Sequence, residues 1–289
     1  MPPRDETRIA VALVAPLIVL EFAVSLFPLV YSFWLSLRQG LLFGGTSSFS
    51  GVDNYLAVGA DSFIGPAVIV SLRFVAETTM LVFCLSLGMA LLLNEKVRGQ
   101  SLLRVIVILP WSLSEFAVGM SGRFFLDPNY GFLNILLIRF HFEKFGTLFL
   151  NAQTGVEWAS LFYAWNFAPI GAFFILSSLQ TVPELLYRSA RIDGASTLGR
   201  FRAVTLPFVK YSILITLVLA TIQSAGAVTI FYALTGGGPG FSTTSISFYA
   251  FRVFFNQGNF GYGAAISWLA LVFIAIAATT YFYLLTRRR

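Results

Sequence analysis

The sequence predicts an all-α membrane protein with six transmembrane helices and both termini in the cytoplasm. Three observations support this fold class: 57% of the residues are hydrophobic and only 11% are charged, the mean hydropathy is +0.80, and the apolar residues gather in stretches of spanning length. Such a chain has too little polar surface to cover a water-soluble globule. Because a bilayer core needs roughly 20 apolar residues per helix, 289 residues accommodate about six or seven spans.

The six spans are expected at residues 9–37, 67–93, 102–126, 157–179, 206–234 and 262–285. Arg4 and Arg8 precede the first span, but no small-residue cleavage site follows before Trp34, so we interpret it as a retained helix and not a signal peptide. The apolar segment 131–142 is too short to cross a bilayer and is expected to be an interfacial or re-entrant helix. No soluble domain fits between the spans, so 1–289 is expected to form a single transmembrane domain.

Lysine and arginine predict the orientation of these spans. The chain has 19 such residues and a formal net charge of +6. With a cytoplasmic N-terminus, 13 of them fall in inside segments, four fall outside and two, Arg73 and Arg123, fall within spans. The positive-inside rule therefore places both termini in the cytoplasm. The arginines form no basic aromatic face, so we expect a lipid bilayer and no nucleic acid as the partner of this charge.

Several residue types needed for catalysis or metal binding are scarce. Cys84 is the only cysteine and His141 the only histidine, which argues against a disulfide, a metal cluster and His-based catalysis. The glycine-rich segment 236–240 lacks the lysine of a phosphate-binding loop, and no Gly-x-Ser-x-Gly nucleophile motif is present. We therefore expect no enzymatic activity, no metal and no cofactor in this chain.

The segment 181–207, between the fourth and fifth predicted spans, is the most informative part of the sequence. Thr181 and Glu184 have capping-box spacing, which predicts the start of a short helix. Asp193-Gly194 predicts a turn, and Ser196 predicts the cap of a second short helix that ends near 207. A compact helix-turn-helix on the cytoplasmic face suits docking into a groove on a soluble partner. The alternative is an amphipathic loop that lies on the inner leaflet, with its arginines near anionic lipid.

This segment resembles the signature of the permease subunits of bacterial ABC importers, especially the carbohydrate-uptake group that includes maltose and glycerol-phosphate permeases. The family pattern is Glu-Ala-Ala, three residues, Gly, nine residues, Ile, one residue and Leu-Pro. The chain matches this spacing with Arg188-Ser189-Ala190, Gly194 and Val204-Thr205-Leu206-Pro207. Further similarity covers most of the chain and lies in Trp165, Pro169 and the segments 179–183, 131–134 and 234–239.

The resemblance implies an ABC importer type I-like permease domain over 1–289 that transports a sugar or a similar polar solute. In the family this loop is the coupling helix that docks on an ATP-binding subunit. It implies a docking set of Glu184, Arg188, Ser189, Ala190, Asp193, Gly194, Ala195, Leu206 and Pro207. Arg188 replaces the family's glutamate, so any carboxylate contact of that residue does not carry over.

The resemblance also implies the partners and the location of the chain. We expect a second permease subunit that is a different chain, two ATP-binding subunits that hold ATP and Mg, and an extracytoplasmic solute-binding protein. The outer segments 128–155 and 236–261 are the expected contacts with that binding protein. The expected location is the bacterial cytoplasmic (inner) membrane, crossed several times.

Sugars are bound by aromatic faces together with planar hydrogen-bonding groups. Side chains of both kinds occur within the predicted spans and form the candidate substrate path: Trp111, Glu115, Tyr163, Asn166, Gln223, Ser224 and Tyr232. Arg73 and Glu77 lie four residues apart, and we interpret them as an ion pair that stabilises packing. Each candidate also has the simpler explanation of a lipid-facing or packing residue.

Two other functions are compatible with a multi-span chain. A secondary transporter driven by an ion gradient would normally have a longer chain with repeated halves and carboxylates at the membrane midplane. A membrane scaffold or assembly factor would need only the cytoplasmic docking loop. Co-purification separates these alternatives from an importer, because only the importer predicts a stoichiometric ATPase and a second permease.

Overall fold

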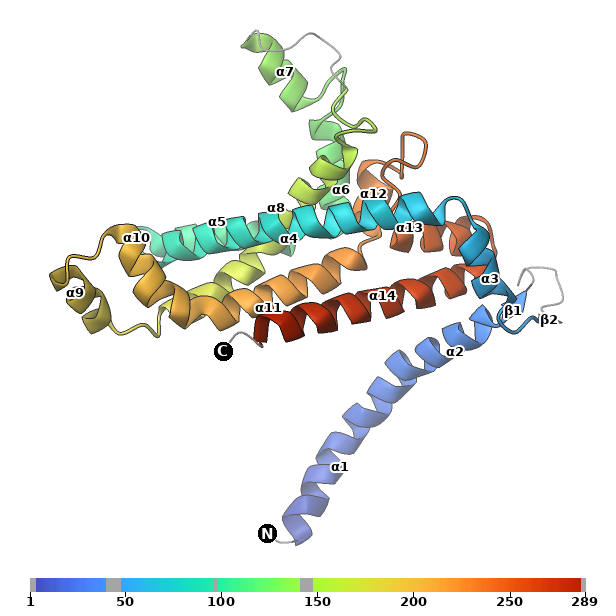
Figure 1. Ribbon diagram of the computed structural model, residues 1–289, viewed down its shortest axis with the longest axis horizontal. Helices are drawn as coiled ribbons and strands as arrows, with labels where there is room; N and C mark the ends of the chain where they lie inside the picture. The colour runs from blue at the N-terminus through green and yellow to red at the C-terminus, as the bar shows by residue number, and fades with distance from the viewer. Residues whose placement is uncertain (1–3, 40–47, 96–97, 141–147, 287–289) are drawn as a thin grey trace. The chain divides into compact units, whose positions relative to one another are not determined.

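The computed structural model describes residues 4–39, 48–95, 98–140 and 148–286. Its contacts divide the chain into two compact units, one of Met1–Asp61 with Ala250–Leu271 and one of Ser62–Tyr249 with Val272–Arg289. The single domain expected over 1–289 stays a prediction. Both units are built mainly from helices, as the sequence predicts (Figure 1).

The larger unit holds most of the helices. In chain order they are α4 (Ile64–Asn94), α5 (Gln100–Ser112), α6 (Glu115–Phe125), α7 (Phe132–Arg139), α8 (Gly155–Leu179), α9 (Glu184–Ile192), α10 (Thr197–Arg200), the π-helix η2 (Phe201–Thr205), α11 (Leu206–Ala225) and α12 (Thr229–Leu234), followed by most of α13 (Ile246–Phe251) and the end of α14 (Phe260–Thr286). Helices α4, α8 and α11 pack against one another. Within this unit α9 and α10 lie at one end of these three helices and α12 lies toward the other end (Figure 1).

Small residues allow α4, α8 and α11 to approach closely. A Cβ on Gly171 of α8 would lie 2.5 Å from the Ser86 hydroxyl of α4 and would also strike the methyl group of Thr216 on α11. The Ser86 hydroxyl donates a 2.8 Å hydrogen bond to the carbonyl of Ala168. Close backbone approach through glycine and serine is typical of helices that pack inside a membrane.

The third predicted span, 102–126, is broken into two helices. It consists of α5 and α6, whose axes are bent by 93° at the break. Leu113 and Ser114 have extended backbone angles, and the Ser114 hydroxyl accepts a 3.2 Å hydrogen bond from the Ala117 amide as the N-cap of α6. The break therefore follows from a serine cap, together with Pro110, which removes a backbone donor near the end of α5.

The fifth predicted span, 206–234, differs from the observed helix at both ends. A continuous helical segment runs from Thr197 to Ala225 through the π-helical turn η2, which directly precedes Pro207. In that turn the Leu206 amide bonds the carbonyl of Phe201, five residues earlier, so the helix continues across a proline that the sequence suggested as a boundary. The helix stops at Gly226, and α12 starts three residues later.

In the part of the chain that the structure describes, four helices are long and apolar enough to cross a membrane: Val11–Ser36, Ile64–Asn94, Gly155–Leu179 and Thr197–Ala225. The bent pair α5 and α6 makes a fifth when it is counted as one span. The last predicted span, 262–285, lies within α14 (Phe260–Thr286). Six spans and cytoplasmic termini stay predictions.

The smaller unit contains α1 (Arg4–Glu21), the π-helix η1 (Phe22–Leu26), α2 (Phe27–Ser36), β1 (Arg38–Gln39), β2 (Ser48–Phe49), α3 (Asp53–Ala60), the π-helix η3 (Arg252–Asn256) and the first part of α14. The strands β1 and β2 pair antiparallel, with Arg38 opposite Phe49. Asn54 joins this turn to α2, because its side-chain amide donates to the carbonyls of Ser36 and Arg38 at 2.8 Å each. Trp268 of α14 donates to the Ser32 hydroxyl at 3.2 Å.

Candidate functional site

The predicted docking loop forms two short helices joined by a tight turn. Helix α9 ends in a Schellman motif: the amide of Gly194 bonds the carbonyl of Arg191, and the amide of Ala195 bonds the carbonyl of Ala190. Gly194 has φ +75°, a conformation that glycine adopts without strain. A Cβ there would meet nothing within 4 Å, so within this chain the glycine is required by its backbone angle and not by lack of space.

The start of α9 differs from the prediction. Thr181 does not cap this helix; its hydroxyl donates a 2.8 Å hydrogen bond back to the carbonyl of Ser178 in α8. Pro183 is the N-cap residue, and its carbonyl accepts from the amide of Leu186 at 3.1 Å. The predicted cap at Ser196 is confirmed, because its hydroxyl accepts from the amide of Gly199 at 3.1 Å.

Helix α9 presents a mixed apolar and charged face to the outside of the larger unit. Leu185 and Ile192 lie two turns apart, and they are 70% and 86% exposed. Arg188 and Ser189 are exposed on the same face between them. Exposed apolar side chains on a capped helix are typical of a protein interaction surface. We call the face formed by Leu185, Arg188, Ser189 and Ile192 the docking face.

The opposite side of α9 fixes the helix to the rest of the unit. The Tyr187 hydroxyl lies 3.0 Å from the hydroxyl of Thr205 in η2, and Ala190 is half-buried. Glu184 begins α9 and forms a 3.1 Å exposed ion pair with Arg188, whereas Leu206 and Pro207 belong to the start of α11. The structure therefore brings Glu184, Arg188 and Ser189 onto one short helix and leaves Leu206 and Pro207 in the long one. The role of this set in docking stays a prediction.

Four of the predicted substrate-path residues lie at the two helix breaks or beside them. Trp111 lies at the end of α5, Glu115 begins α6, Asn166 is on α8, and Tyr232 is on α12. Trp111 and Tyr232 are exposed, whereas Glu115 and Asn166 are half-buried. The breaks bring Asn166 to the backbone at the end of α5 and Glu115 to the start of α12.

Glu115 and Asn166 bond backbone groups at the helix breaks, of which the Pro110 carbonyl also accepts from the Leu113 amide at 3.2 Å. The Asn166 side-chain amide donates to the carbonyls of Pro110 and Leu113, at 2.5 and 3.2 Å. The Glu115 carboxylate accepts a 2.7 Å hydrogen bond from the amide of Ile230 at the start of α12. Non-helical backbone within a membrane protein needs such partners, because lipid offers none.

The other three candidates divide between packing and exposure. Tyr163 is buried and packs edge-on against Phe74, with ring centroids 5.5 Å apart. Ser224 is buried, and its hydroxyl donates to the carbonyl of Thr221 at 3.2 Å. Gln223 is exposed. Of the seven candidates, Trp111, Gln223 and Tyr232 thus have the surface needed to contact a solute, and that role stays a prediction for all seven.

The predicted ion pair of Arg73 and Glu77 is present and extends to a second helix. Arg73 bonds Glu77 at 2.8 Å on α4 and also pairs with Glu157 on α8. The Ser160 hydroxyl donates to Glu77 at 3.0 Å. These contacts join α4 to α8, which agrees with our interpretation of the pair as a packing element.

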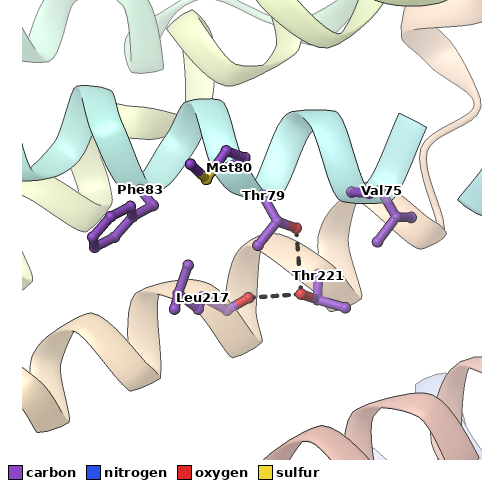
Figure 2. A pocket seen from close by; sticks show the side chains of 7 residues that line it. Val75, Thr79, Met80, Phe83, Leu217 and Thr221 are labelled. Carbon is purple, nitrogen blue, oxygen red and sulfur yellow. Dashed lines mark hydrogen bonds between the residues drawn. The ribbon is translucent and has the colours of Figure 1, made fainter. Parts of the chain in front are cut away.

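A cleft of about 390 Å³ lies between α4 and α11. It is lined by Val75, Ala76, Thr79, Met80, Phe83, Leu217 and Thr221. Figure 2 shows Thr79 and Thr221 facing each other across it, 3.3 Å apart, while Thr221 also donates to the Leu217 carbonyl at 2.8 Å. Because the lining is mainly apolar and these two hydroxyls bond each other, the cleft is poorly suited to a sugar. It includes none of the predicted substrate-path residues.

The segment between α6 and α7, predicted to lie outside, is organised around Asp127. Its carboxylate accepts from the amides of Asn129 and Tyr130, at 2.8 and 3.2 Å, and its carbonyl accepts from the Asn134 side chain at 3.1 Å. Desolvation opposes ionisation of Asp127, but these amides outweigh it and hold the pKa of the carboxyl below its usual range. A Cβ on Gly131 would lie 2.5 Å from the Asp127 nitrogen, so only glycine fits there.

Buried threonines give the outer segment after α12 a fixed structure. The Thr243 hydroxyl donates to the hydroxyl of Thr235 at 2.7 Å, and the Thr244 hydroxyl donates to the carbonyl of Gly237 at 3.0 Å. The amide of Ile246 bonds the hydroxyl of Ser71 on α4 at 2.8 Å. Part of the other expected contact surface, 141–147, lies outside the described residues, as does His141.

Several residues at the helix breaks were missed from the sequence. Phe116 is 47% exposed and lies next to Glu115, and a Cβ on Gly119 would lie 2.7 Å from the Cβ of Ala233 on α12. Ser114 before Glu115 is a cap signal that indicates the start of α6. The pairing of α6 with α12 has no local signal, because it joins residues more than 100 positions apart.

The chain matches a family model described as "Binding-protein-dependent transport system inner membrane component" over residues 72–289. It is 32% identical to the trehalose/maltose transport system permease protein MalF of Thermococcus litoralis, over 96% of this chain and 93% of the relative. The sulfoquinovosyl glycerol transport system permease protein SmoG of Agrobacterium fabrum is 34% identical, over 93% and 86%. The trehalose transport system permease protein SugA of Mycobacterium tuberculosis is 31% identical, over 94% and 87%.

A solved structure supports the fold. The crystal structure of a bacterial ABC transporter involved in the import of the acidic polysaccharide alginate matches with a TM-score of 0.80 at 19% identity, over 98% of this chain and 97% of that one. The permease fold implied by the resemblance is therefore confirmed. The family model covers more than half of the chain, and the three relatives cover nearly all of it. The chain thus belongs to the binding-protein-dependent transport system inner membrane components, the permease subunits of ABC transporters, which are not themselves enzymes.

Proposed function

We propose that this chain forms one half of the membrane pore of an ATP-driven importer for a sugar or a similar polar solute. Family membership supports the importer permease, and the relatives named for trehalose, maltose and sulfoquinovosyl glycerol support the solute class. The single observation that supports the proposed coupling to ATP is the docking face of α9. It offers exposed apolar side chains on a helix that is capped at its C-terminal end and anchored through Tyr187.

In this proposal the docking face fits a groove on an ATP-binding subunit, which holds ATP and Mg. When the ATP-binding subunits close, they move α9, and the anchored turn transmits that movement to α11 through η2. The helical segment Thr197–Ala225 is continuous, so a displacement at its cytoplasmic end reaches the level of the helix breaks. The permease halves then alternate between outward-facing and inward-facing states.

In the proposed orientation both termini lie on the cytoplasmic side of the bacterial inner membrane. Thirteen of the 19 lysines and arginines lie in segments that this orientation puts inside. Helices α9 and α10 lie at one end of the larger unit and the threonine-rich segment after α12 lies toward the other (Figure 1). That separation is what a chain needs when it contacts an ATPase on one side and a solute-binding protein on the other.

The proposed assembly contains a second permease chain, two ATP-binding subunits and an extracytoplasmic solute-binding protein. The ordered segments after α6 and after α12 are the proposed contacts with the binding protein. A related solved structure, with a TM-score of 0.81 at 19% identity, is of an alginate transporter in complex with an alginate-bound periplasmic protein. The exposed side chains of Trp111, Gln223 and Tyr232 are the proposed solute contacts.

Co-purification tests this function. A tagged wild-type chain, expressed with its neighbouring genes, is expected to recover an ATPase and a second permease in constant proportion. Ile192→Glu places a charge on the docking face, and the loss of an apolar contact worth roughly 1.5–3 kcal/mol should lower ATPase recovery about tenfold or more. The second permease should still be recovered, because α9 does not form the membrane interface.

Val52→Glu is the matched control. Val52 is 61% exposed and lies before α3 on the predicted outer side, so the same kind of change there should leave ATPase recovery unaltered. If the wild-type chain recovers no ATPase, the importer proposal is wrong, and an ion-driven transporter or a scaffold takes its place. If Val52→Glu lowers recovery as much as Ile192→Glu, the docking face is not specific.

A further inference from the structure

Two separate helix breaks in the larger unit are held by side chains from elsewhere in the chain. One break separates α5 from α6 at Leu113, and the other separates α11 from α12 after Gly226. Each break leaves a backbone group without a partner in its own helix, the carbonyl of Leu113 at the first and the amide of Ile230 at the second. These groups are bonded by Asn166 from α8 and by Glu115 from α6.

The carboxylate of Glu115 connects the starts of two helices. Glu115 is the first residue of α6, where a negative charge is favourable next to the helix N-terminus. It accepts from the amide of Ile230, which is the second residue of α12 and has no intrahelical acceptor there. A hydrogen bond to a charged acceptor is stronger than one between neutral groups, and more so in a site with little water.

The two short helices also fit each other closely below this contact. A Cβ on Gly119 would lie 3.4 Å from the carbonyl oxygen of Ile230 as well as 2.7 Å from the Cβ of Ala233. A Cβ on Gly122 would lie 3.0 Å from the δ-methyl of Leu234. Helices α6 and α12 therefore move together, because their contact has no space for sliding.

One aromatic ring on each helix is held in a fixed relation by this pairing. Phe116 is 47% exposed and Tyr232 is 50% exposed, and their ring centroids are 6.4 Å apart. Phe116 directly follows Glu115 in α6, and Tyr232 comes two residues after Ile230 in α12. The distance between the rings thus depends on how α6 and α12 pair, and the hydrogen bond of Glu115 to Ile230 joins the starts of the two helices next to the rings.

We propose that Glu115 and Asn166 are positioning residues that clamp the two helix breaks, and that the clamp sets the spacing of an aromatic platform, Phe116 and Tyr232, for the apolar face of a sugar ring. This inference rests on the proposed transport of a sugar. In it Glu115 and Asn166 contact the backbone and not the solute. The platform rings contact the solute alongside the exposed Trp111 and Gln223, since sugar C–H faces bind to exposed aromatic surfaces.

The test compares Glu115→Gln with Glu115→Leu in the whole transporter, reconstituted in lipid nanodiscs. Glutamine keeps an oxygen that accepts from Ile230, so exchange of the Ile230 amide with deuterium and the solute concentration for half-maximal transport should stay within about twofold of wild type. Leucine removes the acceptor, so amide exchange at Ile230 should rise about tenfold or more. The half-maximal solute concentration should rise with it. Ser112→Ala is the control, because that hydroxyl bonds only the carbonyl of Leu109 in its own helix.

A platform variant completes the test. Phe116→Leu should raise the half-maximal solute concentration about tenfold and leave the exchange of the Ile230 amide unchanged, since stacking on an aromatic ring is lost while the clamp stays. The proposal is overturned if Glu115→Gln weakens solute use while the Ile230 amide stays protected, because Glu115 would then contact the solute itself. It is also overturned if Glu115→Leu leaves the amide protected. Amide exchange needs no transport activity, so this outcome is distinct from a failure of the proposed transport function.

Discussion

The docking loop and the helix breaks of the larger unit differ in the contacts that fix their structure. In the docking loop, the hydrogen bonds that shape α9 and its turn join residues two to five positions apart, and the bond between Tyr187 and Thr205 reaches further along the chain. At the helix breaks, the contacts that fix the geometry join residues 53, 56 and 115 positions apart. A locally determined helix can present a variable face to a partner, whereas the breaks keep their shape only when the whole helix bundle is intact.

The largest effect on stability is expected where the packing of the helix bundle depends on a close contact between residues far apart in the sequence. Gly171→Ala would place a methyl group 2.5 Å from the Ser86 hydroxyl, and overpacking of this kind destabilises by about 1–3 kcal/mol. Gly88→Ala is the matched control on α4, because a Cβ there meets nothing within 4 Å. Thermal unfolding of the purified transporter should show a lower midpoint for Gly171→Ala alone. Equal midpoints would show that α4, α8 and α11 have room for an added methyl group at this contact.

A smaller and strictly local effect is expected at the turn of the docking loop. Gly194→Val forces a β-branched side chain into a backbone with φ +75°, which costs about 1–2 kcal/mol, whereas Gly194→Asn is tolerated at this position of a Schellman turn. Trypsin should cleave after Arg191 faster in the valine variant than in the asparagine variant, because the end of α9 opens. The thermal midpoint of the bundle should stay the same in both. A falling midpoint would mean that the loop is not independent of the bundle.

The hydrogen bond between Tyr187 and Thr205 links the docking loop to the helix bundle, and its loss should have a modest effect on stability. Tyr187→Phe removes a hydrogen bond to Thr205 worth about 1 kcal/mol, and Thr205→Val removes the same bond from the other side. Amide exchange of α9 should rise in each variant, and the double variant should add little to either. Solute-stimulated ATP hydrolysis should fall while ATPase recovery is unchanged. Additive effects of the two variants would show that this bond does not anchor the docking loop.

The same difference between local and distant contacts explains what the sequence predicted. The cap at Ser196, the turn at Gly194 and the short helix after Gly131 are set by neighbours in the chain, and each was predicted. The family resemblance predicted the permease fold, which the comparisons confirm.

The errors fall at breaks in apolar segments. Hydropathy is continuous through 102–126 and 206–234, so it cannot show that α6 leaves α5 or that α12 leaves α11. Thr181 was predicted to cap α9, but the preceding helix offers it the carbonyl of Ser178. The backbone contacts of Glu115 and Asn166 had no signal in the sequence either, because they join distant segments, and the place of both residues in the substrate path stays a prediction.

The smallest effect on stability is expected from the ion pair between Glu184 and Arg188, and it isolates the role of charge in docking. Both side chains are well exposed, and such a pair on a helix surface contributes only about 0.3–0.5 kcal/mol. Arg188→Gln and Arg188→Glu should therefore leave the thermal midpoint unchanged. Their effects on ATPase recovery should differ, however, because Arg188 occupies the place of the glutamate in the family pattern that this segment resembles. If the ATPase groove is acidic at this point, Arg188→Glu should lower recovery more than Arg188→Gln, and the difference should shrink at high salt, where exposed charges are screened. Equal recovery of both variants at low and high salt would show that the docking face binds through Leu185 and Ile192 alone.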